Sequence, residues 1–298
     1  MSNKLDDIIE KLNSVKLPDV DFEAYYKAQE EDTLKIKRVV DYYDELDDYI
    51  ENGDKHQGCK LPFVGTHKLF RFRAGEVTLW TGYNGHKKSM MLGFCTLEFL
   101  KEHQKVCIAS FEMKPIKTII RMARQQTHSE AATYDCIAEF MQFTGNNLYI
   151  FDHMGNMSAD RLYAIIYYSA QELNVKHFVI DSLMRVIAGE DNYNDQKDFV
   201  VKLCNLAIKL NIHIHLVHHT KKGKEGEPST RYDAKGSGAI SDNVSNSLIV
   251  WSNKDKKEDM PDVILKCDKQ RDGEWEGSVP IKFDESTMRF NQMFSEQS

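Results

Sequence analysis

Apolar and polar residues follow two alternating patterns along most of the chain. Short apolar runs bounded by polar residues predict buried strands, and apolar residues at helical spacing between several of these runs predict helices. Strands alternating with helices predict an α/β fold with a mostly parallel sheet flanked by helices, and the last three strands predict an antiparallel tail. The predicted strands are 76–82, 106–112, 148–152, 177–181, 213–219, 247–251, 263–271, 279–283 and 288–293.

The first 56 residues follow a different pattern. Apolar residues recur at helical spacing among many charges, and Pro18 interrupts them, so we expect two or more helices and a linker. This segment contains 16 acidic and 8 basic residues, a net charge of −8, so the rest of the chain carries +1 of the total of −7. Turn-forming residues at 52–62 predict a boundary between an acidic helical arm, 1–56, and a core domain, 57–298.

Composition narrows the class of protein. With 41% hydrophobic and 29% charged residues, the chain is typical of globular proteins. It contains no apolar run long enough to cross a membrane, and its first residues lack the apolar core of a signal peptide, so we expect a cytoplasmic protein with no membrane partner. The six cysteines are widely spaced without a CxxC pair, which argues against a zinc module and a disulfide scaffold.

A candidate phosphate-binding motif follows the first predicted strand of the core. Residues 82–89, GYNGHKKS, match the phosphate-binding loop GxxxxGK[ST] except at Lys87, where the pattern has glycine. In such loops backbone N–H groups cradle phosphates, the lysine reaches the β- and γ-phosphates, and the hydroxyl binds Mg²⁺. Either the backbone at Lys87 tolerates a Cβ atom or nucleotide binding is impaired. The predicted ATP-binding residues are Gly82, Asn84, Gly85, His86, Lys87, Lys88, Ser89 and Met90.

Polar residues at the ends of later strands complete a candidate catalytic site. Glu112 can activate water against a γ-phosphate, Asp181 can hold Mg²⁺ together with Ser89, and His219 can sense the γ-phosphate. Alone, a glutamate at a strand end is more often a solvated loop residue, and an aspartate after a buried strand often only forms a turn. Together, however, the phosphate loop, Glu112 and Asp181 occur in the right order on successive strands. A metal cluster at His213 and neighbouring histidines is the weaker interpretation, because no carboxylate or cysteine lies at ligand spacing.

Two further segments carry basic residues. The polar loop 231–243 is either a surface connection or a grip on the phosphates of single-stranded DNA through Lys235, Gly236, Ser237 and Gly238. Lys269 and Arg271 follow a predicted strand. They are either solvated or presented to the nucleotide of a neighbouring subunit.

This set of motifs resembles the DnaB-type hexameric replicative helicases, a family with a RecA-like P-loop NTPase core that includes phage helicase-primases and mitochondrial Twinkle-type helicases. The resemblance extends from about Leu61 to Phe290. It implies ATP and Mg²⁺ as cofactors and Lys235 to Gly238 as a DNA loop in a central channel. It also implies catalytic roles for Lys88, Glu112, Asp181 and His219, and for Lys269 and Arg271 donated in trans. The matching segments are the phosphate loop, ASFEM (109–113), FVIDSL (178–183), LVHHTKK (216–222), KGSGAISD (235–242) and KCDKQRDGEWEG (266–277).

The resemblance also fixes the expected partners and the alternatives. We expect a homo-oligomer, a hexamer, that translocates on single-stranded DNA during replication, with a primase or helicase loader as partner. The family's larger N-terminal domains have no counterpart, which is phage-like, and residues 36–52 resemble the linker helix that packs on the adjacent subunit. The alternatives are a DNA-stimulated RecA-like ATPase without unwinding activity and, because of Lys87, a non-hydrolysing nucleotide-binding ring subunit.

Overall fold

The computed structural model describes residues 21, 38–51, 53, 58–187, 193–220, 238–254 and 259–293. It contains one nine-stranded sheet with the strand order β3-β2-β4-β5-β1-β6-β7-β8-β9. Each predicted strand is present, and the expected α/β fold with an antiparallel tail is confirmed. The strands are β1 (Val77–Thr81), β2 (Val106–Ser110), β3 (Leu148–Ile150), β4 (His177–Asp181), β5 (His213–Val217), β6 (Asn246–Ser252), β7 (Val263–Gln270), β8 (Gly277–Asp284) and β9 (Arg289–Gln292).

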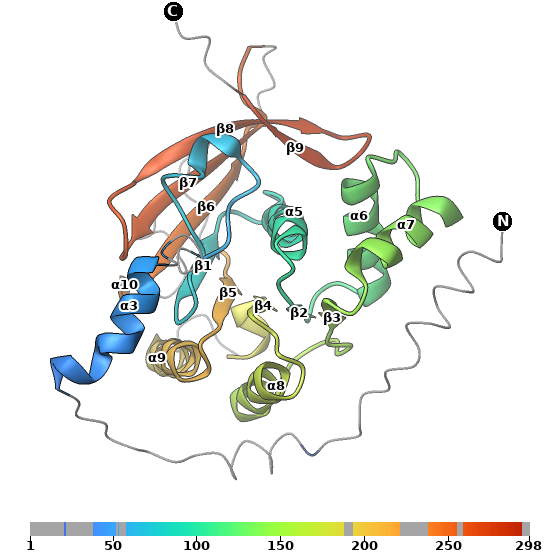
Figure 1. Ribbon diagram of the computed structural model, residues 1–298. Helices are drawn as coiled ribbons and strands as arrows, with labels where there is room; N and C mark the ends of the chain where they lie inside the picture. The colour runs from blue at the N-terminus through green and yellow to red at the C-terminus, as the bar shows by residue number, and fades with distance from the viewer. Residues whose placement is uncertain are drawn as a thin grey trace, which may run out of the picture.

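Helices cover both faces of the parallel part of the sheet. In Figure 1, α5, α6 and α7 lie on one side of the strands, and α8 and α9 lie on the other. In the spatial order of the sheet, the strands β3, β2, β4, β5, β1 and β6 pair in parallel with their neighbours. The strands β6, β7, β8 and β9 pair antiparallel and curve over α5. The helices are α3 (Tyr43–Glu51), α5 (Lys88–Lys101), α6 (Pro115–Thr127), α7 (Tyr134–Thr144), α8 (Ala159–Gln171), α9 (Tyr193–Leu210) and α10 (Gly238–Asn243), with 3-10 turns η1 (Val39–Tyr42), η2 (Val64–Thr66) and η3 (Leu183–Arg185).

The alternation of side chains along each strand divides the core into two layers. Trp80 packs in the layer below α5, and its neighbour Leu79 packs in the layer below α8 and α9. In β4, Val179 packs in the same layer as Trp80, and Phe178 packs in the same layer as Leu79. Because both faces are covered, the parallel strands β1, β2, β4 and β5 are buried along their whole length, which explains their nearly continuous apolar runs, whereas the edge strand β3 is half-buried.

Local sequence signals fix where several helices begin. The Thr133 hydroxyl accepts a hydrogen bond from the backbone N–H of Cys136 and caps α7, and Ser158 caps α8 in the same way. Pro115 occupies the first turn of α6, where a missing N–H costs nothing. Among the described helices, none is both long and apolar enough to span a bilayer.

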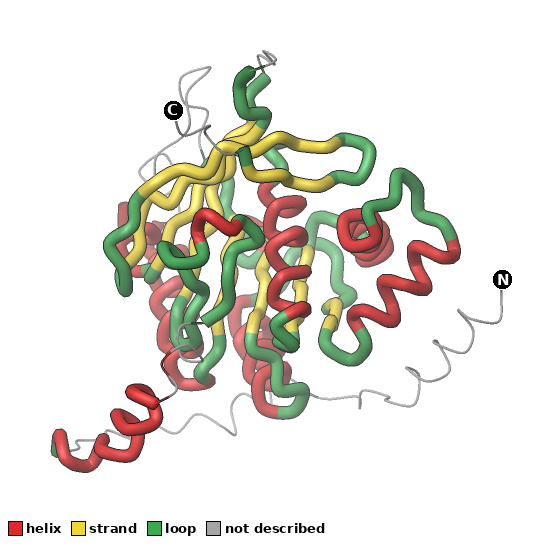
Figure 2. The backbone as a smooth tube through the Cα atoms, turned by 45° about the horizontal axis from the view of Figure 1, so that its top comes forward, coloured by secondary structure: helices red, strands yellow, loops and turns green. Residues whose placement is uncertain are grey.

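Helix α3 stands away from the sheet and its covering helices (Figure 2). It lies within the segment 36–52 that was expected to be helical, and none of its residues is buried. Apolar side chains of this segment are nevertheless exposed, at 82% for Val39, 50% for Leu46 and 78% for Ile50. Such a face is unusual on an isolated surface helix and is typical of a contact with another chain. The boundary predicted at residues 56 and 57 stays a prediction.

Three histidines are buried beneath α5, and hydrogen bonds connect them to neighbouring strands. Trp80 Nε1 donates to His215 Nδ1 at 3.2 Å, and His215 Nε2 lies 3.1 Å from His177 Nδ1. His213 Nε2 lies 2.8 Å from the Thr78 hydroxyl, and its Nδ1 lies 2.6 Å from the carbonyl oxygen of Arg73. Burial lowers the pKa of all three imidazoles, so they are neutral members of the core. In the part of the chain that the structure describes, no group of histidines, cysteines and carboxylates is arranged to hold a metal ion.

Candidate nucleotide site at the carboxyl edge of the sheet

The carboxyl ends of four parallel strands meet at one edge of the sheet. The loop 82–87 follows β1, Glu112 follows β2, Asp181 ends β4, and His219 follows β5. The loop, Glu112 and His219 line an open cleft of about 700 Å³. Asp181 lines a small cavity that shares Ser89 with this cleft. The structure therefore brings together the residues that the sequence placed on successive strands, as expected for the ligand site of a parallel sheet.

Glycines shape the loop between β1 and α5. Gly82 has φ +144°, and a Cβ atom there would lie 2.3 Å from the carbonyl oxygen of Val250, so only glycine fits. Gly85 has φ +80° and is exposed, as is Asn84. His86 is buried, and its Nδ1 accepts a hydrogen bond of 3.0 Å from the backbone N–H of Ser252 at the end of β6. Burial, with nearby lysines, lowers the pKa of His86 to about 4, so the ring remains a neutral anchor of the loop.

Lys87 occupies the position where the loop motif has glycine. Its backbone is left-handed, with φ 66° and ψ 20°, directly before α5. The Lys87 ammonium lies 4.4 Å from the centre of the Phe283 ring in β8, a cation–π contact. The backbone therefore tolerates a Cβ atom here, and the side chain connects the loop to the antiparallel tail of the sheet.

Lys88 and Ser89 begin α5 at the base of the cleft. The Lys88 ammonium donates to the carbonyl oxygens of Gly82 at 2.8 Å and Tyr83 at 2.9 Å. Burial lowers the pKa of Lys88 to about 8, and Asp181 and Glu112 partly oppose this shift. Burial raises the pKa of Asp181, and a hydrogen bond from Ser89 acts in the opposite direction. Met90 follows in the first turn of α5 and also lines the cleft.

Glu112 is held between a hydroxyl and two basic side chains. Its Oε1 accepts a hydrogen bond of 2.9 Å from the Ser182 hydroxyl and lies 3.5 Å from Arg185 Nε. Its Oε2 lies 3.8 Å from His219 Nε2. The interaction with His219 is the largest cause that lowers the pKa of Glu112, to about 2. Glu112 is therefore a carboxylate at neutral pH and accepts hydrogen bonds at the mouth of the cleft.

Sequence reasoning missed three polar residues of this site. Ser182 directly follows β4 and precedes the turn η3, and Arg185 ends this turn; both side chains contact Glu112. Arg121, on α6, lines the cleft; burial lowers its pKa, and nearby Asp181 partly opposes this effect. The sequence gives no signal for Arg121, because only the packing of α6 against α5 brings it to the cleft. The run SLMR after the strand 177–181 was the available signal for Arg185.

Lys269 and Arg271 lie at the opposite edge of the sheet. Strand β7 runs antiparallel to β6, so its end at Gln270 pairs with Asn246, where β6 begins. The Lys269 ammonium donates to the carbonyl oxygens of Ser241, Asp242 and Val244 at 2.8 to 2.9 Å, and thereby caps α10. Arg271 is exposed, and its guanidinium donates to Asp242 O at 3.2 Å.

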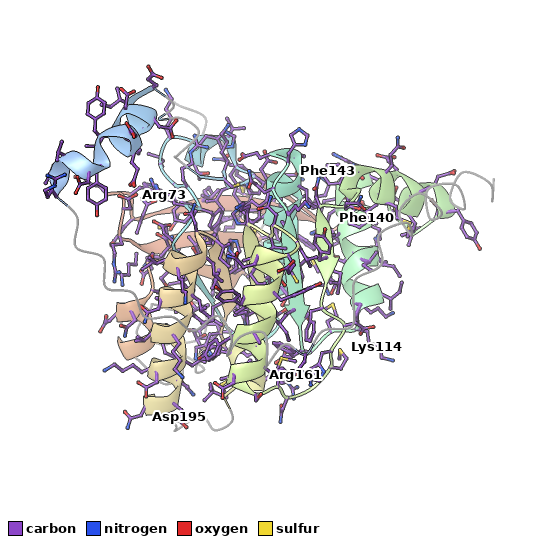
Figure 3. The ribbon with its side chains drawn as sticks, turned by 60° about the horizontal axis from the view of Figure 1, so that its bottom comes forward. Arg73, Lys114, Phe140, Phe143, Arg161 and Asp195 are labelled. Atoms are coloured by element: carbon purple, nitrogen blue, oxygen red, sulfur yellow. The ribbon has the colours of Figure 1, made fainter. Side chains whose placement is uncertain are left out.

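Figure 3 shows the separation of the two edges. Arg73, just before β1, lies at the opposite end of the layers from Lys114, Arg161 and Asp195, which lie near the beginnings of α6, α8 and α9. These helices begin after the carboxyl ends of β2, β3 and β4. Lys269 and Arg271 therefore do not reach the cleft of their own chain. Of the predicted DNA-contacting residues, Lys235, Gly236 and Ser237 lie outside the described residues, and Gly238 begins α10.

Comparison with known proteins assigns the family. A family model described as an AAA domain matches residues 71–225, which are 155 of the 298 residues and include Lys88, Glu112, Asp181 and His219. The chain belongs to the AAA domain family. No curated protein sequence matches this AAA domain protein.

Solved structures define the fold of this AAA domain protein more closely. A solved ATPase domain is similar over 87% of this chain and all of its own length, with a TM-score of 0.75 and 15% sequence identity. A DnaB-like replicative helicase, solved to describe its interactions with primase, is similar over 97% of this chain and 75% of its own, with a TM-score of 0.70 and 16% identity. The expected RecA-like fold of a DnaB-type helicase domain is thus confirmed.

Proposed function

We propose that this AAA domain protein is an ATP-driven DNA helicase that acts as a ring, a hexamer, on single-stranded DNA during replication in the cytoplasm. The observation that carries the proposal is the convergence of Lys88, Ser89, Glu112, Asp181 and His219 at the carboxyl edge, in a chain with the fold of a DnaB-type helicase domain. The match to an AAA domain and the likeness to a solved ATPase domain support the use of a nucleotide.

The residues of the cleft fit ATP and Mg²⁺. Lys88 holds its ammonium over the loop carbonyls, where a phosphate would replace them as its partner. The hydrogen bond between Ser89 and Asp181 places a hydroxyl and a carboxylate together, and Mg²⁺ prefers such oxygen ligands. When bound, Mg²⁺ neutralises charge that develops on the transferred phosphate. Glu112 orients the attacking water as catalytic base, and His219, 3.8 Å from Glu112, connects this base to the γ-phosphate position.

Two observations support a ring. Arg271 is exposed at the edge opposite the cleft, where it can reach only the nucleotide of an adjacent subunit, and Lys269 holds it in place through α10. The apolar side chains around α3 are exposed and available to a neighbouring chain. We further propose that Lys235 to Gly238 contact DNA. Primase or a helicase loader is the proposed further partner, supported by the likeness to a helicase solved with its primase interactions.

Mixed rings test this proposal. Lys88→Ala and Arg271→Ala should each abolish DNA-stimulated ATP hydrolysis, because one removes a cis residue and the other a trans residue. Equal mixing of the two variants should restore part of the hydrolysis, because the interface is intact wherever the cleft of an Arg271→Ala subunit faces Arg271 of a Lys88→Ala subunit. Arg161→Ala is the matched control. It removes an exposed arginine that does not line the cleft, and it should retain full activity.

The outcomes separate the candidate functions. Strand displacement on a forked duplex by the wild-type protein supports a helicase, whereas DNA-stimulated hydrolysis without displacement supports a RecA-like ATPase. If the mixture of variants is as inactive as each variant alone, the assignment of Arg271 to a neighbouring site is wrong. An assembled ring that binds ATP but does not hydrolyse it contradicts the motor function.

A further inference from the structure

A second cleft lies at the amino edge of the sheet, away from the candidate nucleotide site. Its volume is about 770 Å³, similar to that of the carboxyl-edge cleft. His177 and His213, which begin β4 and β5, line it together with the segment before β1 and the turn after α5. The proposed mechanism does not use this amino-edge cleft.

Positive charge dominates the lining of the amino-edge cleft. Lys60, Arg71 and Lys176 are half-buried there, and none of them has a carboxylate within 4.0 Å among the described residues. Arg73 also lines the cleft, but its charge is matched by Asp272 at 3.0 Å. Three cations without carboxylate partners in one cleft give it a positive potential that attracts an anionic ligand.

Among the described residues, one acidic side chain, Glu102, lines the cleft. Glu102 accepts a hydrogen bond of 3.4 Å from the backbone N–H of Lys60, which holds it beside the chain entering the sheet. Because Glu102 supplies one negative charge and Lys60, Arg71 and Lys176 supply three positive charges, the lining has a net positive charge. The amides of Gln104 and Asn211 complete a polar wall.

A buried histidine supplies a donor at the same place. The Trp80 N–H can only donate, so His215 Nδ1 accepts, and the neutral His215 ring carries its proton on Nε2. His215 Nε2 therefore donates to His177 Nδ1, and the neutral His177 ring carries its proton on Nε2. His177 is 3% exposed and lines the cleft, and this Nε2–H has no hydrogen-bond partner among the described residues. This N–H is open to the cleft, where it can donate a hydrogen bond to a ligand.

We propose that the amino-edge cleft binds the phosphate groups of a phosphorylated ligand about the size of a nucleotide. Lys60, Arg71 and Lys176 supply the charge, and His177 donates a hydrogen bond to a phosphate oxygen. The phosphates come either from a free nucleotide or from the backbone of a nucleic-acid strand, which present the same chemistry. This site is separate from the proposed ATPase site and does not depend on the proposed function.

Calorimetry with inorganic tripolyphosphate tests the site in the full-length protein. Wild type should bind two molecules per chain, and Lys88→Ala, which weakens the carboxyl-edge site, should still bind one. In the Lys88→Ala background, Arg71→Gln and Lys176→Gln should each weaken this binding about tenfold, as expected for one cation near a phosphate. Lys117→Gln, an exposed lysine on α6 outside both clefts, should leave it unchanged.

The source of the phosphates follows from competition in the Lys88→Ala variant. Displacement of tripolyphosphate by an oligo(dT) strand but not by ADP indicates a nucleic-acid backbone, and the reverse indicates a free nucleotide. Displacement by neither means that tripolyphosphate binds through general attraction, and this overturns the proposal. Loss of all binding in Lys88→Ala, or equal affinity in Arg71→Gln, Lys176→Gln and Lys117→Gln with unchanged circular dichroism, also overturns it.

Discussion

Acidification should destabilise this protein in a pH window set by its buried histidines. Burial lowers the pKa of His177, His213 and His215 below the usual 6.5, to about 4 for His213. A histidine of this kind stays neutral in the folded protein, whereas the unfolded chain binds a proton near pH 6.5. Its stabilising contribution is therefore complete above pH 6.5 and is lost as the pH falls from 6.5 toward 4.

The size of the effect follows from the two pKa values of His213. The free energy of unfolding should fall by about 2 kcal/mol between pH 7 and pH 5, and by about 3 kcal/mol at pH 4, through His213 alone. This is a large part of the 5 to 15 kcal/mol that stabilises a typical domain, as an order of magnitude.

Other groups act in different windows or with a different sign. Interactions led by His219 lower the pKa of Glu112 to about 2, so its contribution is lost only below pH 4.5. Burial raises the pKa of Glu76 and Asp181, and these groups favour the folded state on acidification. Burial lowers the pKa of His86 to about 4, so it acts in the same window as His213, and a variant is needed to separate the two.

Urea denaturation at pH 7 and pH 5 measures the contribution. The His213→Asn variant cannot gain a proton, and its amide can donate to the Arg73 carbonyl in place of the imidazole. The loss of stability between pH 7 and pH 5 should be about 2 kcal/mol smaller in this variant than in wild type. His103→Asn, at an exposed position with φ 58°, is the matched control and should behave as wild type. An equal loss in His213→Asn and wild type would refute the reasoning.

Two further predictions concern single side chains. Lys269→Met should destabilise α10 by about 2 kcal/mol, because it removes three charge-assisted hydrogen bonds to carbonyl oxygens, and hydrogen exchange of α10 amides measures this loss; unchanged exchange would contradict the capping role. Lys87→Ala should be about 1 kcal/mol less stable than Lys87→Gly in urea denaturation, because both variants lose the Phe283 contact but only alanine keeps the left-handed strain. Equal stability of these two variants would show that the strain is absent.

The strands of this fold could be predicted because the sheet is covered on both faces. Each parallel strand is an apolar run bounded by polar residues, and the nine predicted strands overlap the nine observed ones. The ends differ by up to two residues: 106–112 was expected as one strand, but β2 ends at Ser110, where Phe111 pairs with the Asp181 carbonyl oxygen instead. The layer that each side chain joins follows from its place in the strand. The curvature of β7 to β9 over α5 does not, because it depends on contacts such as Phe94 with Phe290.

The candidate site was predictable only where it lies along strand ends. Glu112, Asp181 and His219 follow buried strands, and parallel strands bring such positions to one edge. Arg121 reaches the cleft from a helix surface, through tertiary packing that no local pattern records. The role of Lys269 as a cap of α10 within its own chain was also missed, because the sequence does not indicate which carbonyl groups its ammonium can reach.

Gly82 and Lys87 show that the glycines of a phosphate loop are required for two different reasons. At Gly82 the requirement is steric, since a Cβ atom would lie 2.3 Å from the Val250 carbonyl oxygen, closer than any real contact. At Lys87 the requirement is conformational, because a left-handed backbone costs a residue with a Cβ about 1 to 2 kcal/mol and blocks nothing. The cation–π contact with Phe283 offsets about 0.5 to 1 kcal/mol of this strain. A departure from the motif at Lys87 is therefore compatible with a folded loop, whereas the same departure at Gly82 would displace β6.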